Sequence, residues 1–457
     1  MRKEMFSHEI SVLRNTFRRL LRRNAHINLR KIIQKTHPAD LAVLFRYFTG
    51  PEQKTLFDLM IENEHAAEFL TELDEAIIIT ILENEEPKRI AALFQNLGSN
   101  DQAEILNLFT EERTNSILVL LQKEEKQEVE EIMGYPEDSA GSIMSVDVFT
   151  LNVNTIAKDA IESLQGQKEA EMVFYLYVTD DKGRLVGVVS LRELVTTHPE
   201  KTLGHIMTKN VASVQPETDQ EEVAKIVSHY NYLAVPVIDL EERLLGIVTI
   251  DDVVDVIREE ATEDFLQMAG VGKDREILLK SSWENARTRL PWLFASWLGG
   301  ISAVAIIGIF EDMLQTTIAL TAFIPVIIGM GGNIGTQSST IIVRGLATGR
   351  VDVGNNLKII LKEIQVGLIL GVLYGVLLGC FAAIKFMNAT PLLGFVVALS
   401  ILSSMIISSF IGSLMPLLFR RLNIDPAIAT GPFVTTSIDI IGVTLYFLIA
   451  SALIPLQ

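Results

Sequence analysis

The sequence predicts a multidomain membrane protein: an α-helical N-terminal superhelix, an α/β tandem repeat, a connecting helix and a domain of five transmembrane helices. Three observations predict this fold class. Mean hydropathy is +0.32 although 21% of the residues are charged, so polar and apolar residues must occupy separate parts of the chain. A pattern repeats within residues 144–262, and five long apolar runs follow residue 290. Each run is long enough to cross ~30 Å of hydrocarbon, which takes about 20 helical residues.

The charge of the chain is divided between these two parts. From Arg287 onward there are nine Lys/Arg and six Asp/Glu, a net charge of +3, whereas the preceding residues hold 30 and 51, a net charge of −21. An acidic soluble half argues against nucleic acid as a partner, because phosphate binding needs positive charge. It favours divalent cations, which prefer hard oxygen ligands. The only cysteine, Cys380, lies in an apolar run, which excludes a disulfide framework and favours a reducing cytosol for the soluble half.

The first domain, residues 1–136, is predicted to be helical, because apolar residues recur at helical spacing over residues 28–133. Three prolines lie at predicted helix starts, where Pro is tolerated: Pro38, Pro51 and Pro87. Asn100 and Thr110 are predicted N-caps. Short helices that alternate with capped turns indicate a superhelix with roughly one helix per 12–15 residues.

The N-terminal stretch lacks the apolar core of a signal peptide and is basic instead. Five arginines lie close together in it: Arg14, Arg18, Arg19, Arg22 and Arg23. We interpret them as a solvated helix face, with contact to anionic lipid as the alternative.

The tandem repeat consists of residues 137–203 and 204–262. Each copy reads strand, helix, strand, polar turn, strand, helix, and Gly187 and Gly246 hold matching places in an apolar strand. Glycine inside a strand usually marks a close approach of another backbone. The segment that begins Leu185-Val-Gly-Val-Val-Ser resembles a CBS domain, so the two copies are identified as a tandem CBS pair and expected to pack as a pseudo-twofold unit.

Residues 263–289 are charged and amphipathic and are predicted to form the connecting (plug) helix, either a rigid linker or a helix that moves. The transmembrane domain is residues 290–457, with predicted spans at 290–310, 314–341, 364–384, 391–418 and 428–455. Basic residues gather in the connections between spans two and three and between spans four and five, and such loops lie in the cytosol. We therefore expect a multi-pass protein of the cell (inner) membrane with cytosolic N-terminal domains and the C-terminus outside.

Asp439 is the most informative residue of the membrane half. It lies inside the last apolar run, Pro426–Leu456, which holds no Lys, Arg or His. A carboxylate in hydrocarbon costs roughly 2.5–3.5 kcal/mol on insertion scales, and an intramembrane acid is functional by default. A cation that passes through the membrane would compensate it. The alternative is a structural carboxylate bonded to neighbouring hydroxyls or backbone.

Two polar segments accompany Asp439. The first, Gly329–Thr340, reads GMGGNIGTQSST, and we expect its exposed carbonyls, Gly331, Gly332, Asn333 and Gln337 to face protein or water. Packing of small residues is the alternative explanation for its glycines. The second, Asp425–Asp439, reads DPAIATGPFVTTSID. Asp425 is placed at the cytosolic mouth, and two prolines free carbonyls. We expect the Thr435 and Thr436 hydroxyls to share a helix face with Asp439.

These segments resemble the MgtE family of magnesium channels. The resemblance also covers the YPEDSAG run at Tyr135–Gly141, the CBS pair, the EATED run at Glu260–Asp264 and the RLPWL run at Arg289–Leu293, in the family's order. It implies a homodimer whose pore lies on the twofold axis and in which Asp439 of each subunit forms the ion-selecting site. It further implies import of Mg²⁺ when intracellular Mg²⁺ is low. Cytosolic acids would then bind Mg²⁺ and hold the connecting helix closed.

The acids expected to bind regulatory Mg²⁺ are dense after residue 250: Asp251, Asp252, Asp255, Glu259, Glu260, Glu263 and Asp264. Like charges three or four residues apart on a helix repel one another, and Mg²⁺ would relieve this repulsion. Weaker candidates for the facing surface are Glu221, Asp101 and Glu104. A solvated acidic face is the alternative. Asn100 and Asn231 stand where the family often has an acid, so we expect weaker Mg²⁺ sensing.

The resemblance also makes ATP a candidate ligand of the CBS pair, although the sequence has no Gly-rich phosphate loop with a Lys. No nucleophile–base pair or catalytic metal motif is present, so we predict that the protein is not an enzyme. Two other functions stay open: a secondary divalent-cation carrier coupled to Na⁺ or H⁺, and a membrane-tethered sensor. An anion channel is disfavoured because the candidate pore residues are acidic.

Overall fold

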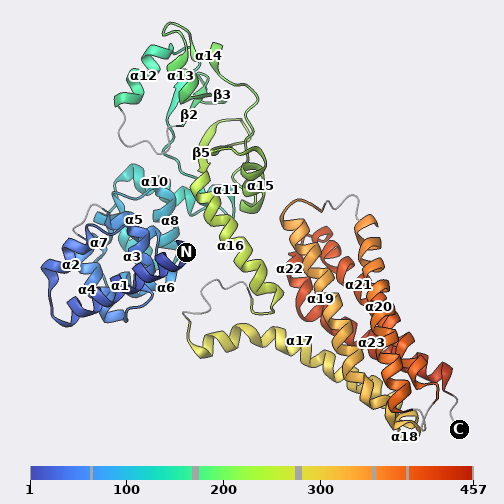
Figure 1. The fold of residues 1–457 in the computed structure, drawn as a ribbon. Helices are drawn as coiled ribbons and strands as arrows, with labels where there is room; N and C mark the ends of the chain where they lie inside the picture. Colours follow the sequence, from blue (N-terminus) through green and yellow to red (C-terminus); the bar gives the residue numbers. More distant parts are fainter. Residues whose placement is uncertain are drawn as a thin grey trace. The chain divides into compact units, whose positions relative to one another are not determined.

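The computed structural model describes residues 2–61, 65–166, 174–272, 280–351, 357–386 and 391–454 (Figure 1). It divides into two compact units, residues 1–258 and 259–457. The boundary falls inside one helix, α16 (Ile250–Met268).

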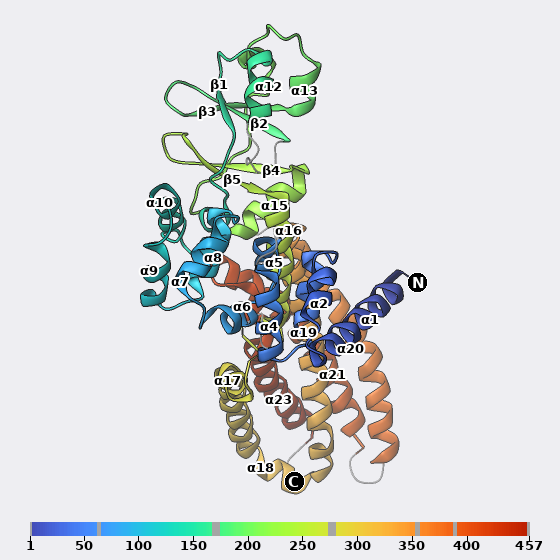
Figure 2. The same cartoon turned by 90° about the vertical axis from the view of Figure 1, so that its left-hand side faces the viewer.

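The first ten helices form the superhelix that the sequence predicts (Figures 1 and 2). Helices two apart in the chain pack together: α1 on α3, α2 on α4, α3 on α5, α4 on α6, α5 on α7, α7 on α9 and α8 on α10. Its core contains fully buried aromatic side chains such as Phe45, Phe57 and Phe94. The helices are α1 (Arg2–Arg22), α2 (His26–Ile33), α3 (Pro38–Phe45), α4 (Gly50–Met60), α5 (Ala66–Thr71), α6 (Glu75–Leu82), α7 (Pro87–Phe94), α8 (Ser99–Asn107), α9 (Glu111–Leu118) and α10 (Lys123–Ile132).

Most of the predicted helix starts are confirmed. Pro38, Pro51 and Pro87 lie in the first turns of α3, α4 and α7, and Thr110 is the N-cap of α9. The prediction for Asn100 is wrong, because α8 already begins at the preceding residue with Gly98 as its extended N-cap. Asn100 is therefore inside the first turn.

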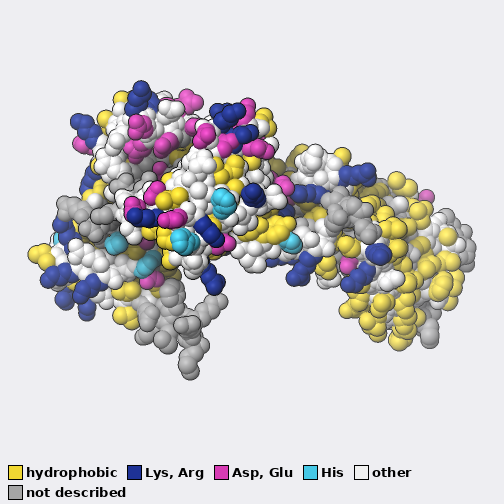
Figure 3. Space-filling model, turned by 90° about the horizontal axis from the view of Figure 1, so that it is seen from above, with side chains coloured by type: hydrophobic (Ala, Val, Ile, Leu, Met, Phe, Trp, Pro, Cys, Tyr) yellow, Lys and Arg dark blue, Asp and Glu magenta, His cyan; other side chains and the backbone are white. Residues whose placement is uncertain are grey.

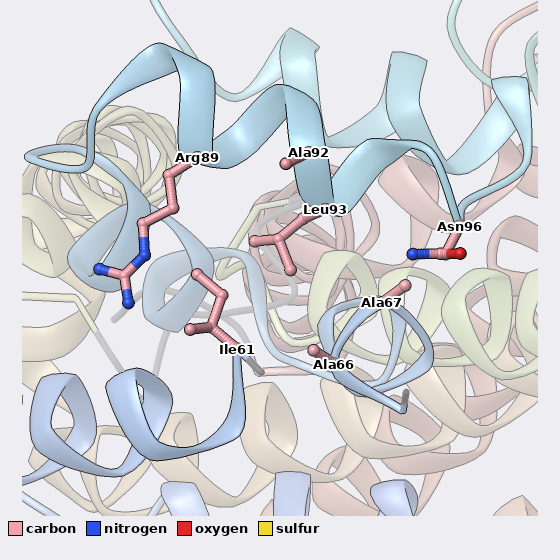
Figure 4. A pocket seen from close by; sticks show the side chains of 7 residues that line it. All are labelled: Ile61, Ala66, Ala67, Arg89, Ala92, Leu93 and Asn96. Carbon is pink, nitrogen blue, oxygen red and sulfur yellow. The ribbon is translucent and has the colours of Figure 1, made fainter. Parts of the chain in front are cut away.

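A shallow pocket lies between α5 and α7 (Figure 4). Its lining is Ile61, Ala66, Ala67, Arg89, Ala92, Leu93 and Asn96. Arg89 already forms ion pairs with Asp58 at 2.9 Å and with Glu85 at 3.0 Å. The remaining lining is mostly small and apolar, so we assign this pocket no function.

The first CBS copy has the predicted order of elements. Strand β1 (Thr150–Asn152) pairs in parallel with β2 (Tyr175–Thr179), which pairs antiparallel with β3 (Leu185–Ser190). The helices of this copy and the short helices beside it are α11 (Ala140–Ile143), α12 (Ala157–Gly166), α13 (Leu191–Thr196) and α14 (Leu203–Ile206).

The second copy contains α15 (Gln220–Tyr230), β4 (Ala234–Ile238) and β5 (Leu244–Thr249), which pair antiparallel. Its predicted first strand is reduced to a single parallel bridge between Val214 and Val237. In the first copy the ladder continues because the Val153 N–H donates to Thr179 O. The matching position of the second copy is Pro216, which has no N–H to donate.

The matching glycines of the two copies have matching neighbours. A Cβ at Gly187 would lie 2.6 Å from Met207 Sδ, and one at Gly246 would lie 2.6 Å from Ser145 O and 3.0 Å from Met144 Sδ. The predicted close approach at both glycines is therefore confirmed. The Leu185 N–H also donates to Glu242 O, and the Leu244 N–H donates to Gly183 O, which joins the two copies symmetrically.

The polar turns of the two copies are built on the same residue pair. Asp180 accepts from the Arg184 N–H and guanidinium, and Asp239 accepts from Arg243 in the same way. The Arg184 backbone N–H is the main cause that lowers the pKa of Asp180. For Asp239 desolvation raises the pKa, but the N–H and guanidinium of Arg243 outweigh this effect, so the pKa is lowered overall.

The second unit contains five helical segments long and apolar enough to cross a membrane, as predicted. They are Ser282–Ile309, Ile318–Ala347, Leu357–Lys385, Leu393–Arg421 and Pro426–Leu453. In the view of Figure 3, hydrophobic side chains cover most of this unit's described surface. The first segment is α17, the second is η1 (Ile318–Phe323) followed by α19 (Ile324–Ala347), the third is α20 and the fourth is α21; a short α18 (Glu311–Thr316) follows α17.

The connecting helix differs from the predicted residues 263–289. It begins earlier, as α16 at Ile250, and ends at Met268, and the next helix, α17, starts at Ser282. Gly270 and Gly272 follow α16 with φ of 70° and 97°, which is left-handed backbone that ends a right-handed helix. Part of the predicted segment, residues 273–279, lies outside the described residues.

Helices α20 and α21 pack antiparallel along a row of glycines. The buried glycines of α20 are spaced four apart: Gly367, Gly371, Gly375 and Gly379. A Cβ at Gly375 would lie 2.7 Å from Ala398 O, and one at Gly379 would lie 2.7 Å from Gly394 O. The row brings the two backbones close together, as small residues do between transmembrane helices.

Candidate functional site

The fifth span is irregular near its start. Asp425 accepts a hydrogen bond of 2.8 Å from the Ala427 N–H and caps α22 (Pro426–Ile428). A π-helical turn, η2 (Ala429–Phe433), follows, in which Gly431 has a non-helical ψ of −132°. Regular helix resumes as α23 (Val434–Leu453). As the two prolines predict, the span is not one continuous α-helix. Irregular backbone at this depth occurs where protein or a water-filled cavity covers it.

Asp439 lies in the second turn of α23 and is partly buried. Within the described part of the chain its carboxylate has no hydrogen-bond or ion-pair partner, so the structural alternative considered above finds no support there. Across from it is Gly332 of α19, where a Cβ would lie 3.8 Å from Asp439 Oδ1. The absence of a side chain at Gly332 leaves open space beside the carboxylate.

Helix α19 carries the glycine-rich segment as regular α-helix. The expectation of exposed carbonyls in this segment is therefore wrong, because a continuous helix bonds its carbonyls internally. Irregular backbone is found instead in the fifth span. The buried Gly331 and Gly335 face Ser404, Ser408 and Ile438 of the neighbouring helices. The glycines thus allow close packing, and only side chains remain as ligands on α19.

Asn333 and Gln337 lie one turn apart on the exposed face of α19. In the described residues neither amide has a hydrogen-bond partner. Gly329 and Ile341, one turn to either side, are exposed as well. Two unsatisfied amides on the surface of an apolar span need water or protein against them, since lipid offers no partner.

The hydroxyls of the two predicted threonines, Thr435 and Thr436, do not contact the Asp439 carboxylate. Thr435 Oγ1 donates to Gly431 O at 3.3 Å and so stabilises the irregular turn. Thr436 packs its methyl group against Gly299 of α17, where a Cβ would overlap it. Neither hydroxyl is within hydrogen-bond distance of Asp439 among the contacts of the described residues.

A second membrane carboxylate escaped the sequence reasoning. Glu363 of α20 is 6% exposed and accepts a 2.8 Å hydrogen bond from Ser338 Oγ of α19. The adjacent Ser339 hydroxyl donates to Thr430 Oγ1 of η2 at 3.3 Å. The sequence places Glu363 directly before the predicted third span, where an acid normally faces water. One sequence signal could have revealed its burial. Glu363 lies four residues before Gly367, so it shares a helix face with the buried glycines of α20.

The seven acids expected after residue 250 all lie on α16, but no three of them meet. Within the described residues, no group of three His, Cys, Asp or Glu side chains could hold a metal ion. Asp252 accepts from the Thr249 N–H at 3.0 Å and caps the helix, and Asp255 pairs with Arg258 at 3.1 Å. The other five are Asp251, which is exposed, and four in the second half of the helix: Glu259, Glu260, Glu263 and Asp264.

The weaker candidates lie on other helices. Glu221 in the first turn of α15 pairs with Lys225 at 2.8 Å, and Asp101 and Glu104 lie on α8. Asn231 is the left-handed C-cap of α15, with φ of 54°. Asn tolerates this backbone better than most residues, so the geometry of the helix end is sufficient to explain an Asn at position 231.

The end of α16 packs against the irregular turn of the fifth span. A Cβ at Gly431 would lie 3.6 Å from Gln267 O and 3.9 Å from Gly270 Cα. Beside this contact the Gln267 amide donates to Glu263 Oε1 at 2.8 Å, and both side chains are buried, at 1% and 7% exposure. The connecting helix therefore touches the one segment of the fifth span whose backbone is irregular.

Comparison with known proteins agrees with this arrangement. Residues 324–449 match a family model described as MgtE, divalent cation transporter, and residues 36–138 match the MgtE intracellular N domain. Residues 140–198 and 203–259 match the CBS domain. A protein named magnesium transporter MgtE from Bacillus subtilis is 34% identical over 95% of this chain and 96% of its own length. The chain belongs to the MgtE family.

Further relatives and solved structures extend this result. The MgtE of Thermus thermophilus is 33% identical over 93% of this chain and 95% of its own length. A solved structure of the cytosolic domain of the Mg²⁺ channel MgtE in complex with ATP is 32% identical. It has a TM-score of 0.50 and covers 53% of this chain and 99% of that chain. The fold class predicted from the sequence, with its helical N domain, CBS pair, connecting helix and five spans, is therefore confirmed.

Proposed function

We propose that the protein is a Mg²⁺-selective channel that imports Mg²⁺ when intracellular Mg²⁺ is low and closes when the ion binds its cytosolic domains. The observation that carries this proposal is Asp439, a partly buried carboxylate without a partner in the described chain, beside open space at Gly332. Family relatives named as magnesium transporters support the choice of ion.

The chemistry of Mg²⁺ suits this site. The ion gives up its water shell reluctantly and is usually held by one or two carboxylates together with several waters. One Asp439 carboxylate with open space beside it would contact a hydrated ion through its waters. Asn333 and Gln337 would add neutral oxygens that accept hydrogen bonds from those waters.

The active form is proposed to be a homodimer with its pore on the twofold axis. The exposed amides Asn333 and Gln337 support this, because an isolated chain would present them to lipid. A second copy would bring two Asp439 carboxylates to one path. The N-terminal domains are proposed to face the cytosol, since basic connections between spans favour that side of a membrane.

Closure is proposed to act through α16. The end of α16 packs on η2. An ion that bridges acids of α16, to one another or to acids of other helices, would hold α16 against this irregular turn. The proposed regulatory ligands remain Asp251, Asp252, Asp255, Glu259, Glu260, Glu263 and Asp264, with Glu221, Asp101 and Glu104 facing them. ATP is proposed as a ligand of the CBS pair, supported by the ATP-bound cytosolic domain of a relative. No catalytic activity is proposed.

The test is Mg²⁺ flux into proteoliposomes for the wild type and for Asp439→Asn, which keeps the size of the side chain. Flux should disappear in the variant, because a neutral amide cannot compensate a divalent ion. In the wild type, flux should stop at ~10 mM Mg²⁺ on the soluble-domain side, a concentration at which weak acidic sites fill. Unchanged flux in the variant would assign Asp439 to structure.

The same experiment separates the carrier alternative. A channel conducts Mg²⁺ down its own gradient, whereas a secondary carrier stops when the Na⁺ or H⁺ gradient is removed. Flux that persists in symmetrical Na⁺ and pH therefore supports the channel. Flux that collapses under these conditions would replace the channel with the carrier.

A further inference from the structure

The region of the first three helices has a net charge opposite to that of the rest of the soluble half. Residues 1–47 hold eleven Lys/Arg and three Asp/Glu, a net charge of +8. The following residues up to Ala286 hold nineteen and forty-eight, a net charge of −29. Such a reversal inside one soluble half indicates a surface for an anionic partner, since scattered charges would suffice for solubility.

Many of the basic side chains in this region point outward. Ile10, Phe17 and Leu29 form the buried side of α1 and α2 in the core of the superhelix. On the opposite side, five exposed basic residues have no ion-pair or hydrogen-bond partner among the described residues: Arg19, Arg22, Arg23, Lys31 and Lys35. We call these five residues, together with Ile27, the basic surface.

Three other cations of the region are already engaged and do not belong to this surface. Arg46 forms an ion pair with Asp74 at 2.7 Å, and Arg18 donates to Tyr47 O at 2.8 Å. Arg14 lies over the ring of Tyr47, 5.2 Å from its centre. The region therefore holds two sets of cations, one that stabilises the fold and one that is unused by it.

An exposed apolar side chain lies among the unused cations. Ile27 is 75% exposed at the start of α2, with Arg23 four residues before it and Lys31 four residues after it. The turn between α1 and α2 is fixed, because Asn24 adopts φ of 49° and the Ala25 N–H donates to Leu20 O. Ile27 thus projects outward from the first turn of α2, next to a turn closed by a backbone hydrogen bond.

This combination decides the chemistry of the partner. A free phosphate would satisfy the cations but cannot take up an apolar side chain, and an acidic protein surface would need an apolar pocket placed among its acids. The interface of an anionic bilayer does both, because headgroup phosphates face the cations and the acyl region accepts the isoleucine. The chain carries five candidate membrane spans, so a bilayer is a surface that this chain meets in any case.

We propose that the basic surface docks on the anionic headgroups of the membrane in which the protein resides, with Ile27 inserted between them. This docking is independent of the proposed ion pathway. It gives the N-terminal helices a second attachment to the bilayer besides the five spans.

The test uses the full chain in nanodiscs. In a Cys380→Ser background, Ile27→Cys is labelled with a polarity-sensitive fluorophore, in discs of phosphatidylcholine and in discs rich in phosphatidylglycerol. We expect a blue shift and roughly threefold or more protection from acrylamide only in the anionic discs. The effect should fall as salt is raised from ~0.05 M to ~0.5 M, since the Debye length shrinks accordingly.

A charge-reversed variant and a matched control identify the cause. Arg22→Glu, Arg23→Glu and Lys31→Glu together should abolish the shift. Reversing three exposed cations elsewhere in the first unit, Lys158, Lys182 and Arg192, to Glu should leave it unchanged. Because all six side chains are exposed, circular dichroism should be the same for both triple variants, which excludes unfolding.

Three outcomes would overturn the proposal. An equal shift in both kinds of disc that still disappears on charge reversal would assign the surface to an acidic protein face. A shift produced in phosphatidylcholine discs by inorganic phosphate alone would assign it to soluble phosphate groups. Absence of any shift in anionic discs would show that Ile27 stays in water.

Discussion

Two glycine-lined helix contacts of the membrane half differ in what accompanies the glycines. Along α20 and α21 the glycines of α20 meet backbone and small or apolar side chains of α21 between Gly394 and Ser409. Along α19 and α23 the glycines 331 and 335 also pack tightly, but Gly332 between them meets only the carboxylate of Asp439. The first contact is explained by packing alone, whereas the second leaves a charged group without a protein partner in the described chain. This difference separates a structural contact from a candidate site.

The largest effect expected from this comparison concerns the packing contact. Gly375→Val should prevent α20 and α21 from approaching, because a Cβ there would lie 2.7 Å from Ala398 O, which is backbone and cannot give way. Overpacking costs about 1–3 kcal/mol or more, which corresponds to a fall of roughly 5–10 °C in Tm. Thermal unfolding in detergent measures it. The control is Gly308→Val on α17, where a Cβ meets nothing within 4 Å; equal losses in both variants would contradict the packing account.

A smaller change at the other contact should alter transport without altering stability. Gly332→Ala adds one methyl group at ordinary contact distance, 3.8 Å, from Asp439 Oδ1. It should narrow the space for a hydrated ion and lower Mg²⁺ flux about tenfold, the equivalent of ~1.4 kcal/mol, with Tm unchanged. Gly329→Ala on the same helix, with no neighbour within 4 Å of its Cβ, is the control and should keep wild-type flux. A fall in Tm rather than in flux would make Gly332 a packing residue like those of α20.

The contact between α16 and η2 should affect closure rather than conduction. Gln267→Ala removes the donor to the buried Glu263 and leaves its carboxylate without this hydrogen bond, which costs about 1–3 kcal/mol in the docked state. The Mg²⁺ concentration that halves the flux should therefore rise by roughly fivefold or more. Flux at low Mg²⁺ should stay at the wild-type level.

Phe265→Ala is the matched control for this prediction, because Phe265 lies on the same helix and is 68% exposed. It should leave the closing concentration unchanged. An unchanged concentration for Gln267→Ala as well would separate α16 docking from closure.

Much of this architecture follows from local signals in the sequence. The spans, the superhelix and the matching glycines Gly187 and Gly246 were predictable, because periodicity and glycine in a strand have direct physical causes. The first strand of the second CBS copy is missing because Pro216 has no N–H for one hydrogen bond of the ladder. The importance of this single position does not follow from the composition of the segment. The earlier start of α16 depends on Thr249 and Asp252, which bond across the strand–helix boundary.

The membrane site was predicted unevenly for a similar reason. The cost of an unpaired carboxylate marks Asp439 in the sequence, because no basic residue shares its span. The backbone of the glycine-rich segment was predicted wrongly, since glycines between transmembrane helices serve close packing as readily as irregular backbone. Glu363 was missed because its partner, Ser338, comes from another helix, and only tertiary structure shows that it is buried.

The smallest expected effect is a change in stability at Glu363, and it comes from comparing the two membrane carboxylates, Glu363 and Asp439. Glu363 is buried and bonded to Ser338, so it behaves as a structural acceptor, whereas Asp439 has open space beside it. Glu363→Gln keeps an oxygen that accepts from Ser338 and should change the free energy of unfolding by less than about 0.5 kcal/mol. Glu363→Leu leaves the Ser338 hydroxyl unsatisfied and should cost about 1–3 kcal/mol. Thermal unfolding of the two variants distinguishes them. If Glu363→Gln lowers Tm as far as Glu363→Leu does, the negative charge itself is required there, and Glu363 joins Asp439 as a second carboxylate that needs a cation.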